Sequence, residues 1–168
     1  MPSAPDFVAI GHVTLDRMGD ATRPGGGALY AAITAHRLGL SVGLLTSHAA
    51  DFPLDAIPSR IEVVTVDASA TTRFEHRYAA GGRVSHVRGR AAPLSAADVP
   101  ADWLGAPLVL LAPVLDEVDP RLAVEFAEGA VAAAAACAGS LTVEGEGWVT
   151  VPDRAALDAA LAEYRRDD

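Results

Sequence analysis

The sequence contains no lysine, because all 13 of its basic residues are arginines. That absence excludes a Schiff-base enzyme, a lysine nucleophile and the lysine of a G-x-x-x-x-G-K-[ST] phosphate-binding loop. Asparagine is absent as well. The single cysteine, Cys137, excludes an internal disulfide, and its place in an alanine run is typical of buried packing.

Long apolar runs and a secretory signal are also missing. No apolar run approaches the roughly 18 residues that a membrane span needs. The opening residues MPSAPDF lack the basic-then-apolar order of a signal peptide, so we expect a cytoplasmic protein with no membrane partner. The formal net charge of −9 repels phosphate backbones, so we expect no nucleic-acid partner either.

The 168 residues, 51% of them hydrophobic, are enough for one folded domain over 1–168. Apolar runs predict buried strands at 7–10, 41–47, 61–67 and 108–114, and helical spacing predicts a helix at 28–39 that ends at Gly39. Residues 11–20 are expected to form a polar connection and 51–57 a short helical turn. This alternation predicts an α/β fold with a parallel sheet covered by helices.

The second half of the chain predicts further helices. Residues 94–105 are expected as a short helix with Ser95 as its N-cap and Trp103 as an apolar anchor. A second helix is expected at 121–140 and a closing helix at 153–166, with a strand-like stretch at 141–152 between them.

Residues 71–91 alternate in a way that predicts a β-hairpin with its tip at 79–82. One face carries arginines and a glutamate and does not resemble a core, which favours a flap or an interface element. His76 and His86 are candidates to face each other across the hairpin, but a pair without a third ligand is weak evidence for zinc.

Gly25, Gly26 and Gly27 stand directly before the first predicted helix. A dinucleotide fingerprint, G-x-G-x-x-G after a strand, fits poorly, because Tyr30 occupies the third glycine position. Two interpretations remain open. The glycines either let a polar ligand approach the N–H groups at the start of the helix, or they form a tight turn with no ligand.

The order of elements around these glycines carries a resemblance. A strand ending at Gly11, then Asp16, the glycines, a helix ending 37-RLG-39, the strand 43-GLLTS-47, a hairpin beginning 71-TTRF-74 and the strand 109-VLLAPV-114 follow one another. This order resembles the N-terminal region of the ribokinase/PfkB family of carbohydrate kinases. The resemblance implies a reduced ribokinase-like three-layer α/β sandwich with a β-hairpin lid over about 71–91.

The same resemblance implies a substrate site for a sugar, polyol or nucleoside. Asp16 would hold hydroxyls, and Gly25, Gly26 and Gly27 would line the pocket. Tyr30 stands where many members have asparagine, which suggests a different substrate or a filled pocket. The lid often mediates dimers in the family, so a homodimer through 71–91 is a further expectation.

Two family motifs are missing from the chain. Neither the D-T-x-G-A-G-D stretch with its catalytic aspartate nor the magnesium-linked N-x-x-E motif occurs, so no catalytic residue is assigned. ATP and Mg²⁺ are therefore implied by the resemblance alone. Because 126–161 is similar to the family's C-terminus, the comparison suggests an internally shortened member with the join at about 119–126.

Asp116, Glu117 and Asp119 follow a predicted central strand, where ligands of α/β sheets tend to bind. They are candidates for a substitute Mg²⁺ site, although a solvated acidic loop explains them more simply. Three functions follow: a sugar- or polyol-binding protein with little kinase activity, an active kinase with substitute residues, or a non-catalytic module that self-associates through the hairpin.

Overall fold

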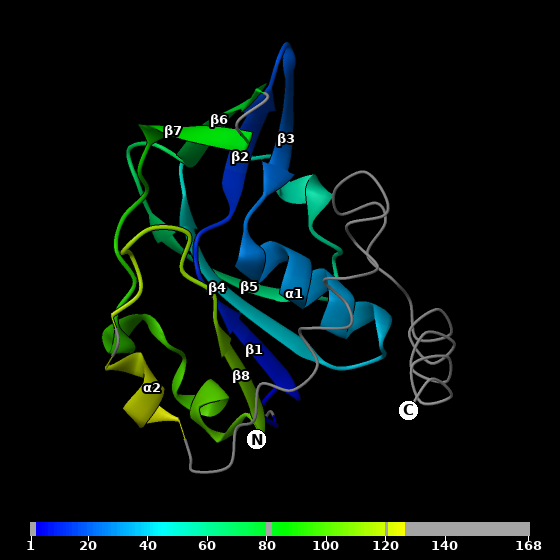
Figure 1. The fold of residues 1–168 in the computed structure, drawn as a ribbon. Helices are drawn as coiled ribbons and strands as arrows, with labels where there is room; N and C mark the ends of the chain where they lie inside the picture. The colour runs from blue at the N-terminus through cyan, green and yellow to red at the C-terminus, as the bar shows by residue number, and fades with distance from the viewer. Residues whose placement is uncertain (1–2, 80–81, 120, 127–168) are drawn as a thin grey trace, which may run out of the picture.

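The computed structural model describes residues 3–79, 82–119 and 121–126 (Figure 1). Cys137, most of the helix expected at 121–140, and the elements expected at 141–152 and 153–166 lie outside these residues. Within them, no helix is long and apolar enough to cross a membrane.

A four-stranded parallel sheet forms the centre of the described structure (Figure 1). Its strands are β1 (Phe7–Ile10), β4 (Val42–His48), β5 (Glu62–Asp67) and β8 (Leu108–Leu111), in the order β5-β4-β1-β8. All four pair in parallel, as the apolar runs predicted. Every residue of β4 is buried, which explains why its sequence lacks the alternation of a half-exposed strand.

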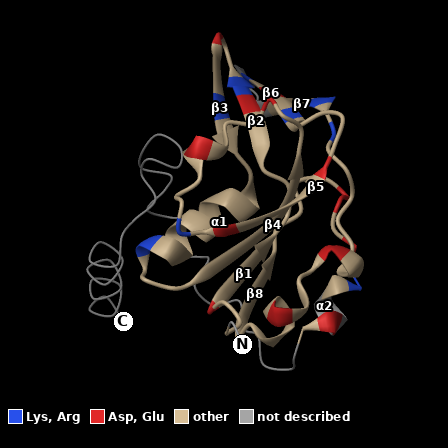
Figure 2. Cartoon of the chain, turned by 180° about the vertical axis from the view of Figure 1, so that it is seen from behind, with Lys and Arg blue, Asp and Glu red and all other residues tan. Residues whose placement is uncertain are grey.

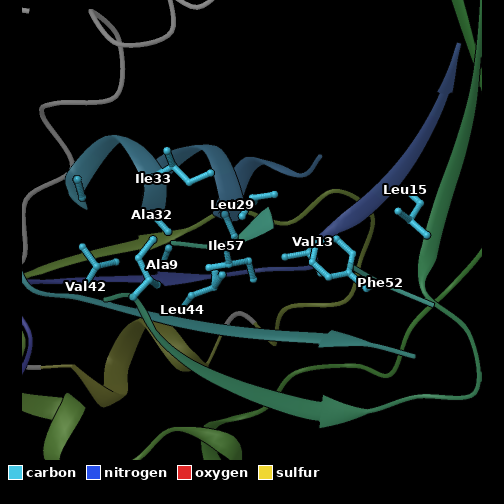
Figure 3. Close-up of a cluster of buried hydrophobic side chains, with 13 residues drawn as sticks. Ala9, Val13, Leu15, Leu29, Ala32, Ile33, Val42, Leu44, Phe52 and Ile57 are labelled. Carbon is cyan, nitrogen blue, oxygen red and sulfur yellow. The ribbon is translucent and has the colours of Figure 1, made fainter. Parts of the chain in front are cut away.

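Helix α1 (Gly27–Arg37) covers one face of this sheet. Leu29 and Ile33 of the helix are buried in the same hydrophobic cluster as Ala9 and Leu44 of the sheet (Figure 3). Burying side chains of this size stabilises the fold by roughly 1.5–3 kcal/mol each. The helix ends where predicted. Gly39 adopts a positive φ of 89°, and its N–H donates a hydrogen bond to the carbonyl of His36.

The opposite face is covered by short turns and not by the predicted helix at 94–105, which is wrong. The segment forms two 3-10 turns, η2 (Ala96–Asp98) and η3 (Ala101–Gly105). Pro100 separates them, because proline disfavours helical backbone at the residue before it. The capping and anchoring predictions are confirmed: Ser95 Oγ and N–H both donate to Asp98 Oδ2, and Trp103 is fully buried.

Two further predictions of helical structure have different outcomes. The turn η1 (Leu54–Ala56) lies inside the segment expected to form a helical turn at 51–57. Helix α2 (Leu122–Glu125) begins where the helix at 121–140 was expected but lasts four residues. A continuous helix from 121 is wrong, because Phe126 has extended backbone (φ −88°, ψ 146°) and buries its ring instead.

A second sheet projects from the carboxyl ends of the parallel strands (Figure 1). Its order is β3-β2-β6-β7, from β2 (Thr14–Met18), β3 (Ala21–Gly25), β6 (Thr72–Ala79) and β7 (Gly82–Gly89). The hairpin at 71–91 is confirmed as β6 and β7. The polar connection at 11–20 is wrong, because β2 pairs in parallel with β6 and turns into β3 at Gly19, which has a positive φ of 61°.

Candidate functional site

Asp16 and Gly25 meet on adjacent strands of the small sheet. The antiparallel register places Gly25 opposite Thr14, and Asp16 opposite Arg23. Thr14 Oγ1 donates a 2.8 Å hydrogen bond to Asp16 Oδ1, which orients the carboxylate. A Cβ at position 25 would collide with Asp16 Oδ2 and lie 2.9 Å from Thr14 Oγ1. The residue at 25 must therefore be glycine for Asp16 to keep this position.

Gly26 and Gly27 differ in whether the structure requires glycine at their positions. Gly26 has a φ of 104°, and a Cβ there would collide with the carbonyl oxygen of His12. Gly27, the first residue of α1, is exposed, and a Cβ there would meet only Ala112 at ordinary contact distances. The turn thus requires Gly25 and Gly26, whereas neither backbone conformation nor space requires Gly27.

Tyr30 lies one turn into α1 and is half-buried against the core beneath the helix. Burial raises the pKa of its hydroxyl, the nearby Asp16 carboxylate raises it further, and Arg23 opposes both. The phenol therefore stays protonated at neutral pH and remains a hydrogen-bond donor. Tyr30 is thus close enough to Asp16 to interact with it electrostatically, whereas its role in ligand binding stays a prediction.

His76 also lies near Asp16, and Ser85 lies next to His76, whereas the sequence suggested His76 only as a partner for His86. His76 Nε2 lies 3.9 Å from Asp16 Oδ1, and His76 Nδ1 lies 2.8 Å from Ser85 Oγ. The imidazole stacks on Phe74 with centroids 5.8 Å apart. Alternation along β6 predicted that Phe74 and His76 share a face, but only the pairing of β2 with β6 brings Asp16 to that face.

The expected pairing of His76 with His86 is wrong. The hairpin register pairs His76 with Ser85, and His86 with Glu75, so the two histidines lie on opposite faces of the sheet. His86 shares its face with the ion pairs of Glu75 to Arg77 and Arg88. These arginines donate hydrogen bonds to Glu75 and lower its pKa to about 2. Charged residues gather on this small sheet (Figure 2).

The acidic loop after β8 does not form a cation site. Glu117 is buried and accepts hydrogen bonds from the N–H groups of His12, Val114 and Leu115, at 2.9–3.2 Å. Burial raises the pKa of Glu117, but these N–H donors outweigh it and the net pKa is lowered. The carboxylate therefore links the carboxyl ends of β1 and β8.

Asp116 and Asp119 are also engaged elsewhere. Asp116 forms an ion pair with Arg90, and Asp119 pairs with Arg121 and accepts its backbone N–H. Across the part of the chain that the structure describes, no three carboxylate, histidine or cysteine side chains are grouped to hold a metal. These residues do not fit the Mg²⁺ that the family resemblance implies, so we derive no step through it.

His12 connects the two sheets. This buried side chain donates from Nε2 to the Ala92 carbonyl at 2.7 Å, and its Nδ1 accepts from the Thr72 hydroxyl at 2.7 Å. Thr72 Oγ1 accepts in turn from the N–H of Ala91. Because Thr72 begins β6 and Ala91 follows β7, the imidazole fixes the base of the hairpin to the end of β1.

Comparisons with known proteins show which fold this chain has. No protein-family model and no curated protein sequence matches the chain. Solved structures do match. One is the sulfate complex of a pyrophosphate-dependent kinase in the ribokinase family (TM-score 0.58, 23% identity, 72% of this chain and 48% of that one). Another is a pyrophosphate-dependent kinase of that family with a pyrophosphate analog and myo-inositol (0.54, 24%, 67% and 42%).

Ribokinase from Giardia lamblia is a third match (TM-score 0.53, 18% identity, 73% of this chain and 48% of that one). At sequence identities of 18–24%, the structural similarity shows that this chain shares the fold of these proteins. The chain spans less than half the length of each of these three neighbours.

Proposed function

We propose that this chain, whose described residues have the ribokinase-like fold, binds a sugar or polyol through Asp16. The observation that carries the proposal is the Asp16 carboxylate itself. Thr14 orients it, Gly25 leaves it room, and it lies on a sheet that projects from the carboxyl ends of the parallel strands. A carboxylate accepts two hydroxyl hydrogen bonds, and both are charge-assisted. One neighbour of the same fold is described in complex with myo-inositol, which supports a hydroxylated ligand.

We further propose that these 168 residues bind such a ligand without transferring phosphate to it. The chain lacks the D-T-x-G-A-G-D stretch, and the described acidic residues do not form a Mg²⁺ site. Loss of a general base typically costs about 10²–10⁴ in rate, and loss of oxyanion-type stabilisation about 10²–10³. Neighbours of the same fold are described in complex with a pyrophosphate analog and with ATP, so the fold alone does not choose a phosphoryl donor.

Isothermal titration with myo-inositol, D-ribose, D-fructose and adenosine tests the proposal, with and without Mg-ATP or pyrophosphate. We expect heat from at least one hydroxylated ligand and no turnover of either donor. Asp16→Asn removes the charge and should weaken binding at least tenfold, since hydrogen bonds to charged groups contribute about 1.5–3 kcal/mol.

Asp20→Asn is the matched control, because Asp20 is an exposed aspartate at the tip of the same β2–β3 hairpin. Equal affinities for both variants would contradict the assignment of Asp16. A second candidate function is self-association through β6 and β7, which the 54% exposure of Val84 on the arginine-rich face favours. Absence of ligand heat, with a dimer that dissociates when 73–90 are deleted, would favour that candidate instead.

A further inference from the structure

Strand β7 (Gly82–Gly89) forms an edge of the small sheet, because the order of the described strands, β3-β2-β6-β7, ends with it. The residues from Val84 to Arg88 are all exposed. Alternate residues of an edge strand direct their N–H and C=O groups away from the sheet, where another extended chain can bind them. This edge is eight residues long and contains no proline, so its backbone is suited to pairing with a further strand.

The face of the sheet beside this edge carries an excess of positive charge. Arg17 on β2 is the register partner of Glu75 on β6, so the two side chains lie on one face. Arg77 and Arg88 lie there too, because both form ion pairs with Glu75. On this arginine face, defined by Arg17, Arg77, Arg88 and Glu75, the cations outnumber the carboxylate (Figure 2). The whole chain, in contrast, has a formal net charge of −9.

Glu75 holds two of these guanidinium groups without using all of their donors. Arg77 donates from Nε and Nη2 to Glu75 Oε1, at 2.9 and 2.7 Å. Arg88 donates from Nε to Glu75 Oε2 at 2.9 Å, and its Nη2 lies 2.8 Å from the same oxygen. A guanidinium has five N–H donors, so the Nη1 groups remain for a ligand. The Arg77 and Arg88 side chains are 66% and 51% exposed, which leaves them accessible to an incoming carboxylate.

We propose that β7 is a docking site for an extended acidic segment of a partner protein, which adds a strand to the small sheet and places its carboxylates on the arginine face. Every second side chain of the added strand lies on that face, so the segment that fits has Asp or Glu at alternate positions. The residues between them lie on the opposite face beside Val87, whose 41% exposure favours apolar partners. The inference does not depend on hydroxyl binding by Asp16, which lies on that opposite face with Phe74.

Charge separates this partner from other occupants of the same edge. A nucleic acid or an anionic membrane extends beyond the arginine face and meets the field of a chain with a net charge of −9, which repels it. The β7 edge of a second copy would place one arginine face beside another, and like charges on adjacent strands are destabilising. A short acidic strand meets only the positive face, because charges act over about 8 Å at physiological salt.

Fluorescence anisotropy of a labelled peptide with the sequence TEVEVET, titrated with the whole chain, tests the docking site. The peptide TQVQVQT keeps the alternation without the charge, and TVEEEVT keeps the composition without the alternation. We expect saturable binding of TEVEVET that weakens as the salt concentration rises. TVEEEVT should bind at least fivefold more weakly, and TQVQVQT should show no measurable binding.

Arg88→Gln should weaken binding of TEVEVET about fivefold, which corresponds to about 1 kcal/mol, the upper range for an exposed ion pair. The double variant with Arg77→Gln should weaken it about twentyfold. Arg60→Gln is the matched control, because Arg60 is an exposed arginine just before β5, at the amino ends of the parallel strands. It makes the same change in net charge and should bind TEVEVET as the wild type does.

The contribution of the β7 backbone is tested with two further peptides, in which either the three glutamates or the two valines of TEVEVET are N-methylated. Only one alternate set of N–H groups faces the sheet in an added strand, so one of these peptides should bind and the other should not. Equal affinities would overturn strand addition. This comparison uses the wild-type chain, so it remains decisive if circular dichroism shows that an arginine variant does not fold.

Other results would assign the arginine face to a different occupant and overturn the inference. Equal binding of TEVEVET and TVEEEVT, or equal affinities of Arg88→Gln and Arg60→Gln for TEVEVET, would do so. A wild-type dimer that Arg88→Gln dissociates in sedimentation, without peptide binding, would assign the face to a second copy of this chain. Binding of a 20-base oligonucleotide or of phosphatidylserine vesicles that is tighter than peptide binding would assign it to an extended polyanion.

Discussion

Gly25 and Gly27 are close in sequence, but an added methyl group would meet different surroundings at each. At Gly25 it would collide with the Asp16 carboxylate, and at Gly27 it would meet only Ala112 at ordinary contact distance. We therefore expect Gly25→Ala to lower the free energy of unfolding by about 1–3 kcal/mol, the usual cost of overpacking. Gly25→Ala should also abolish ligand binding, because Asp16 must move.

Gly27→Ala is the control for that substitution. Its φ is not positive, so alanine should leave stability unchanged or raise it by up to about 1 kcal/mol. Urea unfolding of both variants measures the difference. A stable Gly25→Ala variant that still binds ligand would show that Asp16 does not occupy the position described.

The residues of the site differ in how far the sequence could predict them. The proximity of Asp16 to Gly25 could be predicted, because both lie within one short segment whose order of residues is informative. His76 could not be placed there, because its proximity to Asp16 depends on the register between β2 and β6, which are far apart in the chain. The alternation of β6 predicted only which residues share a face.

At the scale of elements, Glu117 joins the ends of β1 and β8, and this contact predicts a pH dependence. The pKa of Glu117 is lowered from its ordinary value of 4.5 on folding. The stability that it contributes is therefore fully present well above pH 4.5 and is lost as the pH falls through the lowered folded value.

Glu117→Gln should thus be less stable than the wild type at pH 7, because a neutral amide cannot accept the three N–H bonds as a carboxylate does. The difference should shrink as the pH falls below 4 and the wild-type carboxyl takes up a proton. Asp102 is exposed and lies in η3, so Asp102→Asn serves as the control for replacing a carboxylate with an amide where no buried N–H groups depend on it. A difference in urea midpoint that is constant from pH 7 to pH 3 would contradict this assignment.

Elements were predictable where one physical signal dominated. The strands β1, β4, β5 and β8 are apolar runs that are buried in a parallel sheet, so composition alone indicated them. Strand β2 was missed because its exposed end carries Arg17 and precedes Gly19-Asp20, which resembles a loop. Pairing with the distant β6 overrides that local signal.

At the scale of the whole molecule, the described residues form a sheet with α1 on one face, short turns and α2 on the other, and a second sheet at the carboxyl ends of the strands (Figure 1). This arrangement confirms the reduced ribokinase-like sandwich, although the hairpin lies in a four-stranded sheet and not alone. Leu122 and Phe126, within the proposed join at 119–126, are buried in the core beneath the turns. The join therefore stays a proposal that is compatible with a packed core.

The most direct test of the account is the position at which a polyol perturbs the protein. In a ¹³C,¹⁵N-labelled sample of the whole chain, titration with myo-inositol and D-ribose should shift the amide resonances of Asp16, Gly25, Gly27 and His76 in a saturable manner. Glu75 faces away from Asp16 on the same strand as His76, so its side-chain carboxyl resonance should stay unchanged. Shifts confined to other regions, or none with either ligand, would contradict a hydroxyl-binding site at Asp16.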